Sequence, residues 1–96
     1  MIVRFHPQAE LEFEHSADHY YELDPDLAVR FHSEIQAAIL RILHHPNAWP
    51  LGINDTRQCR VHGFPYTLVY KTIRSEIFII AVAHQRKNPN YWRFRD

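Results

Sequence analysis

Segment 84–95 gathers side chains that can exchange protons, bind anions and stack on flat rings. Histidine is the side chain suited to exchanging protons at physiological pH, which makes His84 a candidate acid or base, and the planar guanidinium of Arg86 can donate several hydrogen bonds to an anion. Tyr91 adds a phenol, and together with the indole of Trp92 it could stack on unpaired bases. Further cations suited to binding a target are Lys87, Arg93 and Arg95, with Arg60 earlier in the chain. In the alternative interpretation, the two aromatic rings pack against a sheet and the arginines are merely solvated.

The charges are divided between the two halves of the chain, although the net charge is zero. Residues 1–50 carry three arginines and eight carboxylates, which gives 3 − 8 = −5. Residues 51–96 carry eight cations and three carboxylates, which gives 8 − 3 = +5. This polarity indicates either two solvated faces of opposite bias or a basic region that binds an acidic or anionic partner.

The length of 96 residues and an apolar content of 46% predict one globular domain. The longest apolar run, residues 77–83, is far shorter than the roughly twenty residues of a membrane helix, so no membrane association is expected. Cys59 is the sole cysteine, and the N-terminus lacks a basic leader, so we expect a reducing cytoplasm. His15 and His19 lie one helical turn apart without a third ligand, and we expect neither a metal nor a cofactor.

The N-terminal half should contain two helices. Pro7 is suited to a first helical turn, and the apolar positions that follow it, Ala9, Phe13, Ala17 and Tyr20, lie on one helical face. Asp24 and Pro25 then form a cap and first-turn proline for a second helix, which should end near His45 because Pro46 disfavours helical geometry before it. The apolar stripe of the second helix is Leu27, Phe31, Ile35, Ala38 and Ile42. We therefore expect a helical hairpin with both stripes on a sheet.

The predicted sheet combines an N-terminal strand, Ile2–Phe5, with three strands at residues 57–62, 66–71 and 77–83. Segment 77–83 is apolar at every position, which is typical of a central strand covered on both faces. The fold class predicted from these elements is α+β, with a two-helix hairpin packed on a small antiparallel sheet.

Short motifs follow one another along nearly the whole chain: Tyr20 and Tyr21; Ala28, Val29, Arg30, Phe31 and Ile35; His45 and Pro46; Phe64, Pro65 and Tyr66; Leu68, Val69 and Tyr70; and Val82, Ala83, His84, Gln85 and Arg86. In their order and spacing these motifs resemble RelE/ParE toxins of bacterial type II toxin–antitoxin systems. The ending Pro89, Asn90, Tyr91, Trp92 and Arg93 resembles the ParE-like, plasmid-stabilisation branch. The resemblance implies a single toxin domain over residues 1–96, a microbial RNase-like fold, a cognate antitoxin and growth arrest.

The resemblance leaves three functions open. A ParE-like toxin poisons DNA gyrase without chemistry of its own. A RelE-like toxin is a metal-free endoribonuclease that cleaves mRNA on the ribosome, and His84, Arg86 and Tyr91 would then be its catalytic candidates. Similar ribonucleases carry an arginine where this chain has Thr67, which favours the gyrase-directed function. A non-toxic relative acting as a binding module is the third possibility.

Overall fold

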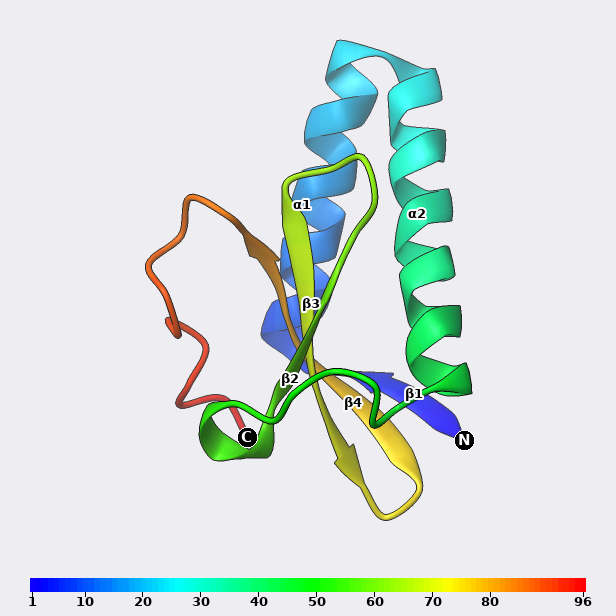
Figure 1. The fold of residues 1–96 in the computed structure, drawn as a ribbon. Coiled ribbons are helices and arrows are strands. Elements are labelled where there is room, and N and C mark those ends of the chain that lie inside the picture. Colours follow the sequence, from blue (N-terminus) through cyan, green and yellow to red (C-terminus); the bar gives the residue numbers. More distant parts are fainter.

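The computed structural model describes all 96 residues and has two helices followed by a strand-rich half (Figure 1). Strand β1 (Ile2–Phe5) leads into helices α1 (Pro7–Leu23) and α2 (Pro25–His44). A short 3-10 helix, η1 (Ile53–Asp55), precedes strands β2 (Arg57–Arg60), β3 (Tyr66–Ile73) and β4 (Glu76–His84). The predicted α+β class is confirmed. Neither helix is both long enough and apolar enough to cross a membrane.

Four strands form one sheet in the order β1-β4-β3-β2, so the predicted central position of residues 77–83 is confirmed. The neighbours β2–β3 and β3–β4 are antiparallel, whereas β1 runs parallel to β4. The sheet is therefore mixed, and the expectation of an antiparallel sheet was wrong for this edge. The direction of β1 is not fixed by a hairpin, because the helical hairpin separates it from the other strands.

Asp24 joins the two helices and caps both of them. Its backbone N–H donates to the carbonyl of Tyr20 at the end of α1, and its carboxylate accepts from the N–H of Asp26 at 3.0 Å. Pro25 then occupies the first turn of α2, where the absent N–H would have no helical partner. His6 caps α1 in the same way, because its Nδ1 accepts from the N–H of Gln8 at 3.0 Å. The predicted starts of both helices and the predicted end of α2 near His45 are confirmed.

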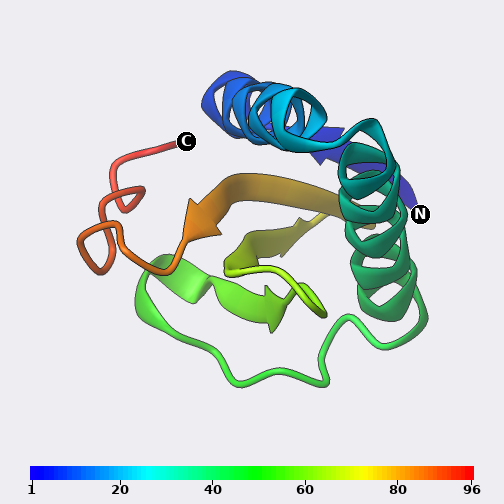
Figure 2. The ribbon, with the colours of Figure 1, turned by 90° about the horizontal axis from the view of Figure 1, so that it is seen from above.

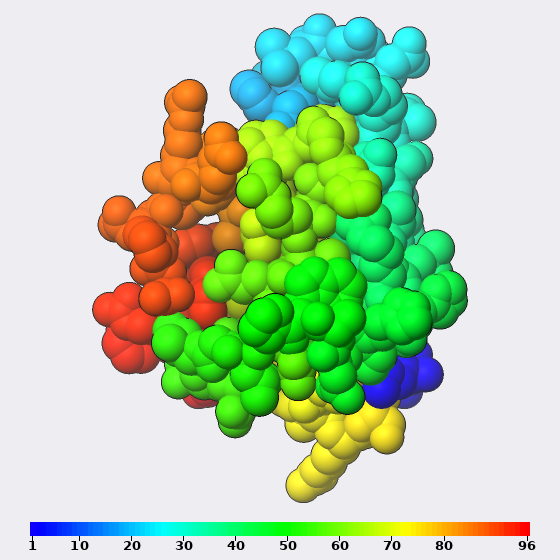
Figure 3. Space-filling model, viewed as in Figure 1, coloured from blue at the N-terminus to red at the C-terminus, as the bar shows by residue number.

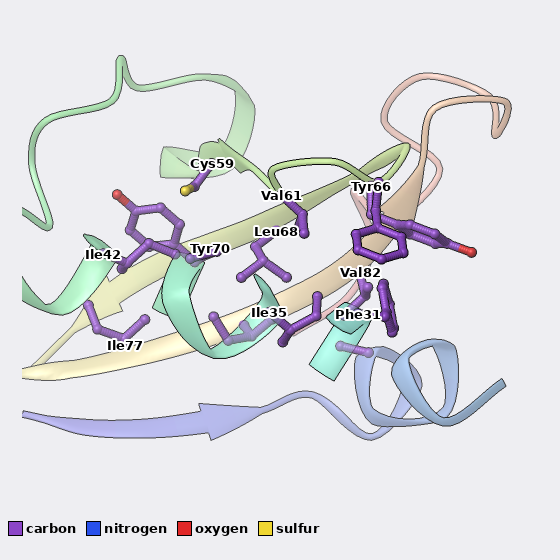
Figure 4. Packing of buried hydrophobic residues seen from close by; sticks show 14 residues of the cluster. Phe31, Ile35, Ile42, Cys59, Val61, Tyr66, Leu68, Tyr70, Ile77 and Val82 are labelled. Atoms are coloured by element: carbon purple, nitrogen blue, oxygen red, sulfur yellow. The ribbon is translucent and has the colours of Figure 1, made fainter. Parts of the chain in front are cut away.

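The helical hairpin covers one face of the sheet. The main core joins Phe31, Ile35 and Ile42 of α2 to alternate side chains of β3 and β4 (Figure 4). Ala9 is the most buried apolar residue of α1, and the other members of its predicted stripe are partly buried against this core. Cys59 is also part of the core, and burial raises the pKa of its thiol, which therefore stays protonated.

A second, smaller core lies on the other face of the sheet and is closed by the C-terminal segment. It contains Val69, Phe78, Ile80, Ala81 and Trp92. In the view from above, α2 and the C-terminal segment lie on opposite sides of the strands (Figure 2). Strand β4 is thus covered on both faces, as its continuous apolar sequence predicts.

Three strands differ from the prediction in their bounds, and β4 does so by one residue at each end. Strand β2 ends at Arg60, whereas β3 continues to Ile73 because Ile73 pairs with Glu76. Only Arg74 and Ser75 remain in the turn, and both have positive φ, 48° and 67°. This combination of a two-residue loop and positive φ at both positions is a type I′ hairpin.

Candidate functional site

Glu12 on α1 is the point at which the C-terminal segment is fastened to the fold. Its carboxylate accepts two hydrogen bonds from the Arg95 guanidinium, at 2.9 and 3.1 Å, and one from the Tyr91 hydroxyl at 2.5 Å. The backbone N–H of Val82 on β4 donates to the same carboxylate at 3.0 Å. One side chain therefore joins the helix, the central strand and the end of the chain.

Tyr91 is a structural donor in this arrangement. Burial raises the pKa of its hydroxyl well above the usual value, and the hydrogen bond to the negatively charged Glu12 carboxylate raises it further. The proton therefore stays on Tyr91 at neutral pH and points at Glu12. A hydroxyl held in this way is poorly suited to deliver a proton to a leaving group.

Trp92 and Arg95 also hold the segment in place. The Trp92 side chain is only 3% exposed and is surrounded by the second core, so its faces are not open for stacking on bases. Arg95, besides binding Glu12, donates to the carbonyl of Ile80 at 3.1 Å. Of these two target-binding candidates, Trp92 packs against the sheet as the alternative interpretation expects, whereas Arg95 is paired with Glu12 and is not solvated as that interpretation expects.

His84 lies at the end of β4 and retains one free ring nitrogen. Its Nδ1 accepts from the backbone N–H of Arg86 at 3.0 Å, and its ring stands edge-on to Tyr66 at 5.0 Å between centroids. The accepting role of Nδ1 assigns the proton of the neutral ring to Nε2. The side chains of Arg86 and Lys87 are exposed next to it.

The pocket at the end of the sheet beside His84 is small. Thr67 on β3 pairs with Arg60 of β2 on one side and with Ala83 of β4 on the other. Thr67 and His84 line a pocket of about 190 Å³, which is smaller than the roughly 300 to 1,000 Å³ typical of ligand sites. The side chain of Arg60 lines a separate hollow. The structure therefore brings His84, Lys87 and Tyr91 to one pocket, with the Lys87 ammonium 5.6 Å from the centre of the Tyr91 ring, while the Tyr91 hydroxyl is taken up by Glu12. The exposed side chain of Arg86 follows His84 but does not line this pocket.

Arg93 and Phe94 are the exposed members of the C-terminal segment. Phe94 is 82% exposed, and the Arg93 guanidinium lies 4.7 Å from the centre of its ring. Asn54 in η1 donates to the carbonyl of Arg93 at 2.8 Å. In the space-filling view the segment, orange to red, forms one flank of the molecule beside the green chain around η1 (Figure 3).

The sequence reasoning missed two residues of this surface. Phe94 could have been noticed as an aromatic residue between two arginines. Glu12 gave no such signal, because a glutamate among Glu10, Leu11, Phe13 and Glu14 resembles any solvent-facing position of an amphipathic helix.

A family model for the ParE toxin of the type II toxin–antitoxin system parDE matches residues 3–89. The chain belongs to the ParE toxin family. The expected RelE/ParE-type toxin of a type II system is thereby confirmed. The matched residues include His84, Arg86 and Lys87 but end before Tyr91, so the part of the segment fastened by Glu12 lies beyond the match.

A solved structure has the same fold as this ParE toxin family member. It is described as the chromosomal ParDE TA system from P. aeruginosa, and it is 18% identical, with a TM-score of 0.75. The alignment covers 88% of this chain and 95% of that one. At this identity the likeness shows the fold alone. No curated protein matches the chain.

Proposed function

We propose that this ParE toxin arrests growth by binding DNA gyrase in the cytoplasm and trapping it through surface contacts, without chemistry of its own. A cognate antitoxin would neutralise it. The observation that carries the proposal is the hydrogen bond from Tyr91 to Glu12. It removes from use the phenol that a ribonuclease mechanism would need as a second proton-transfer group beside His84.

Two further features favour binding over cleavage. Thr67 occupies the position at which similar ribonucleases carry an arginine, and a hydroxyl does not offset the charge that develops on a phosphate. The pocket that Thr67 shares with His84, about 190 Å³, is also smaller than the roughly 300 to 1,000 Å³ typical of ligand sites. His84, Arg86 and Lys87 would have to supply base, acid and charge stabilisation without the phenol.

The exposed cations suit contact with an enzyme that is bound to DNA. Arg86, Lys87 and Arg93 have exposed side chains in the C-terminal segment, which forms one flank of the molecule (Figure 3). Rim charges of this kind accelerate association and set orientation, while buried contacts supply most of the affinity. Arg60 has an exposed side chain on the neighbouring strand and would extend this basic surface.

The same basic surface suits an acidic antitoxin segment. Such a segment would be drawn to Arg86, Lys87 and Arg93 and would cover them, so the target could not reach them. Its affinity would depend on apolar contacts, for which α1 and α2 offer a hollow lined by Phe13, Tyr21 and Val29.

Controlled expression in one culture tests the function. Plasmid supercoiling, DNA breaks and the ends of translated messages are measured together, for the wild type and for His84→Ala. The proposal expects plasmid supercoiling to fall and DNA breaks to accumulate while the messages stay intact. The His84→Ala variant should give the same result as the wild type. Defined cuts in messages that disappear in His84→Ala or Arg86→Ala would instead establish a ribosome-dependent ribonuclease. Unimpaired growth would indicate a non-toxic binding module.

A further inference from the structure

The end of the chain alternates between side chains that are fastened to the fold and side chains that are displayed. Trp92 is 3% exposed, Arg93 and Phe94 are exposed, and Arg95 is bound to Glu12. An aromatic ring that is 82% exposed gains little from the hydrophobic effect in the free protein, so burial does not explain Phe94. The Arg93 guanidinium is exposed and donates one hydrogen bond, to the nearby carbonyl of Asn90 at 3.1 Å.

The displayed pair is held rigidly on both sides. Backbone hydrogen bonds from Arg93 to Asn90 and from Arg95 to Trp92 close two successive turns. Asn54 fixes the carbonyl of Arg93 from η1, and the Arg93 guanidinium lies over the Phe94 ring. A contact group ordered in advance loses less conformational entropy on binding, and such anchors contribute most to affinity.

The surroundings of Phe94 indicate what kind of partner it fits. The adjoining hollow is lined by the apolar side chain of Ile53, by two cations, Lys71 and Arg93, and by two carboxylates, Asp55 and Asp96. The charges balance, so this patch does not attract a phosphate backbone as a basic groove would. It matches a protein surface that offers an apolar recess for the ring and a carboxylate beside it for the Arg93 guanidinium.

We propose that Arg93 and Phe94 form the anchor by which the toxin contacts its protein target, and that Glu12 is the positioning residue that holds this anchor in place. The inference rests on the proposed function in taking the target to be DNA gyrase. It assigns to Trp92 and Arg95 a supporting role in place of direct contact. Glu12, far away in sequence, becomes necessary for toxicity without touching the target.

Single substitutions of exposed residues test the anchor. Purified Phe94→Ala and Arg93→Ala are compared with wild type in gyrase supercoiling and in growth arrest, with Leu40→Ala and Arg74→Ala as matched controls. Leu40 is 53% exposed on α2, and Arg74 lies at the tip of the β3–β4 hairpin. We expect the half-inhibitory concentration to rise roughly 30-fold or more for Phe94→Ala, as for an aromatic hot-spot residue, and to stay unchanged for the controls.

The outcomes separate this inference from the proposed function. If both anchor variants inhibit gyrase as strongly as the wild type does, the anchor is contradicted and the gyrase target stands. Growth arrest that requires Phe94 without any gyrase inhibition supports the anchor and contradicts the gyrase target. A wild type that does not arrest growth contradicts both. A labelled single-stranded oligonucleotide that binds the wild type and is lost in Phe94→Ala would reassign the ring to base stacking and overturn the protein partner.

A double-mutant comparison tests the positioning role of Glu12. We expect Glu12→Gln to weaken inhibition in the wild-type background and to have no further effect in a Phe94→Ala background, because the anchor it positions is already absent. Full additivity of the two losses would reduce Glu12 to a merely structural residue. If Glu12→Gln does not fold, Tyr91→Phe removes only one hydroxyl, and the same non-additivity is expected. Trypsin should cleave after Arg93 faster in either positioning variant than in the wild type.

Discussion

The Arg95 guanidinium and the Glu12 carboxylate form a two-point hydrogen-bonded ion pair between residues 83 positions apart in the sequence. Both side chains are largely withdrawn from solvent, with 17% and 19% of their surface exposed. The pair connects the first helix to the last residues of the chain. The conformation of the C-terminal segment therefore depends on a residue in the opposite half of the protein.

Replacing Glu12 by alanine should destabilise the fold. The change leaves the Arg95 charge without its counter-ion, and the Val82 N–H and the Tyr91 hydroxyl without an acceptor. Breaking a largely buried pair in this way costs about 2 to 4 kcal/mol of unfolding free energy. Urea unfolding followed by circular dichroism measures the loss. Glu14→Ala is the matched control on the same helix, because Glu14 is exposed, and it should change stability by less than about 0.5 kcal/mol. Equal stability of the two variants would show that the ion pair contributes nothing.

Alkaline pH should weaken the fold through Tyr70. Burial raises the pKa of Tyr70 from 10.0 to about 12, an effect that the nearby Arg57 only partly offsets. A raised pKa in the folded state means that this contribution is fully present below pH 10 and is lost as the pH rises toward 12. Melting temperatures measured across this range should fall less steeply in Tyr70→Phe than in the wild type. The variant should begin from a lower value, because it lacks the hydrogen bond to the Pro46 carbonyl.

The hairpin turn between β3 and β4 should tolerate a stabilising change. Ser75 has a φ of 67°, a region that glycine occupies without steric cost and serine does not. Ser75→Gly should therefore raise the unfolding free energy by up to about 1 kcal/mol. Thermal unfolding measures the gain, and Ser33→Gly within α2 should have the opposite effect. A loss at both positions would contradict the assigned turn geometry.

Association with the cognate antitoxin should depend on salt. Exposed charges are screened over about 8 to 10 Å at physiological ionic strength, so raising the salt from a low concentration should slow association several-fold and change dissociation little. Stopped-flow mixing gives both rates. Replacing Arg86 and Lys87 by glutamine should flatten the salt dependence. An association rate indifferent to salt, with the C-terminal segment still open to proteolysis in the complex, would contradict neutralisation by covering this surface.

The local elements of the fold were predictable because each has a local cause. Periodic apolar residues and the prolines at positions 7, 25 and 46 define both helices, and the unbroken apolar sequence of residues 77–83 identifies the central strand. The direction of β1 has no such cause, since four residues without a hairpin connection can add to the sheet edge either way. Its parallel pairing is a property of the assembled fold.

The candidate site was predictable only in part, for the same reason. The types of side chain in the C-terminal segment are visible in the sequence, but which of them are displayed depends on distant partners. Tyr91 and Arg95 have the same donor chemistry whether they face a target or Glu12. Only the folded chain shows that both face Glu12, which leaves Arg93 and Phe94 exposed.

A supercoiling reaction with purified gyrase tests the central claim most directly. Wild-type toxin and His84→Ala are titrated into gyrase with relaxed plasmid and ATP. Because the proposed mechanism is contact without catalysis, both should inhibit at the same concentration, and each inhibited reaction should contain cleaved DNA held by gyrase. Full supercoiling in the presence of a wild-type chain that arrests growth in cells would contradict the account.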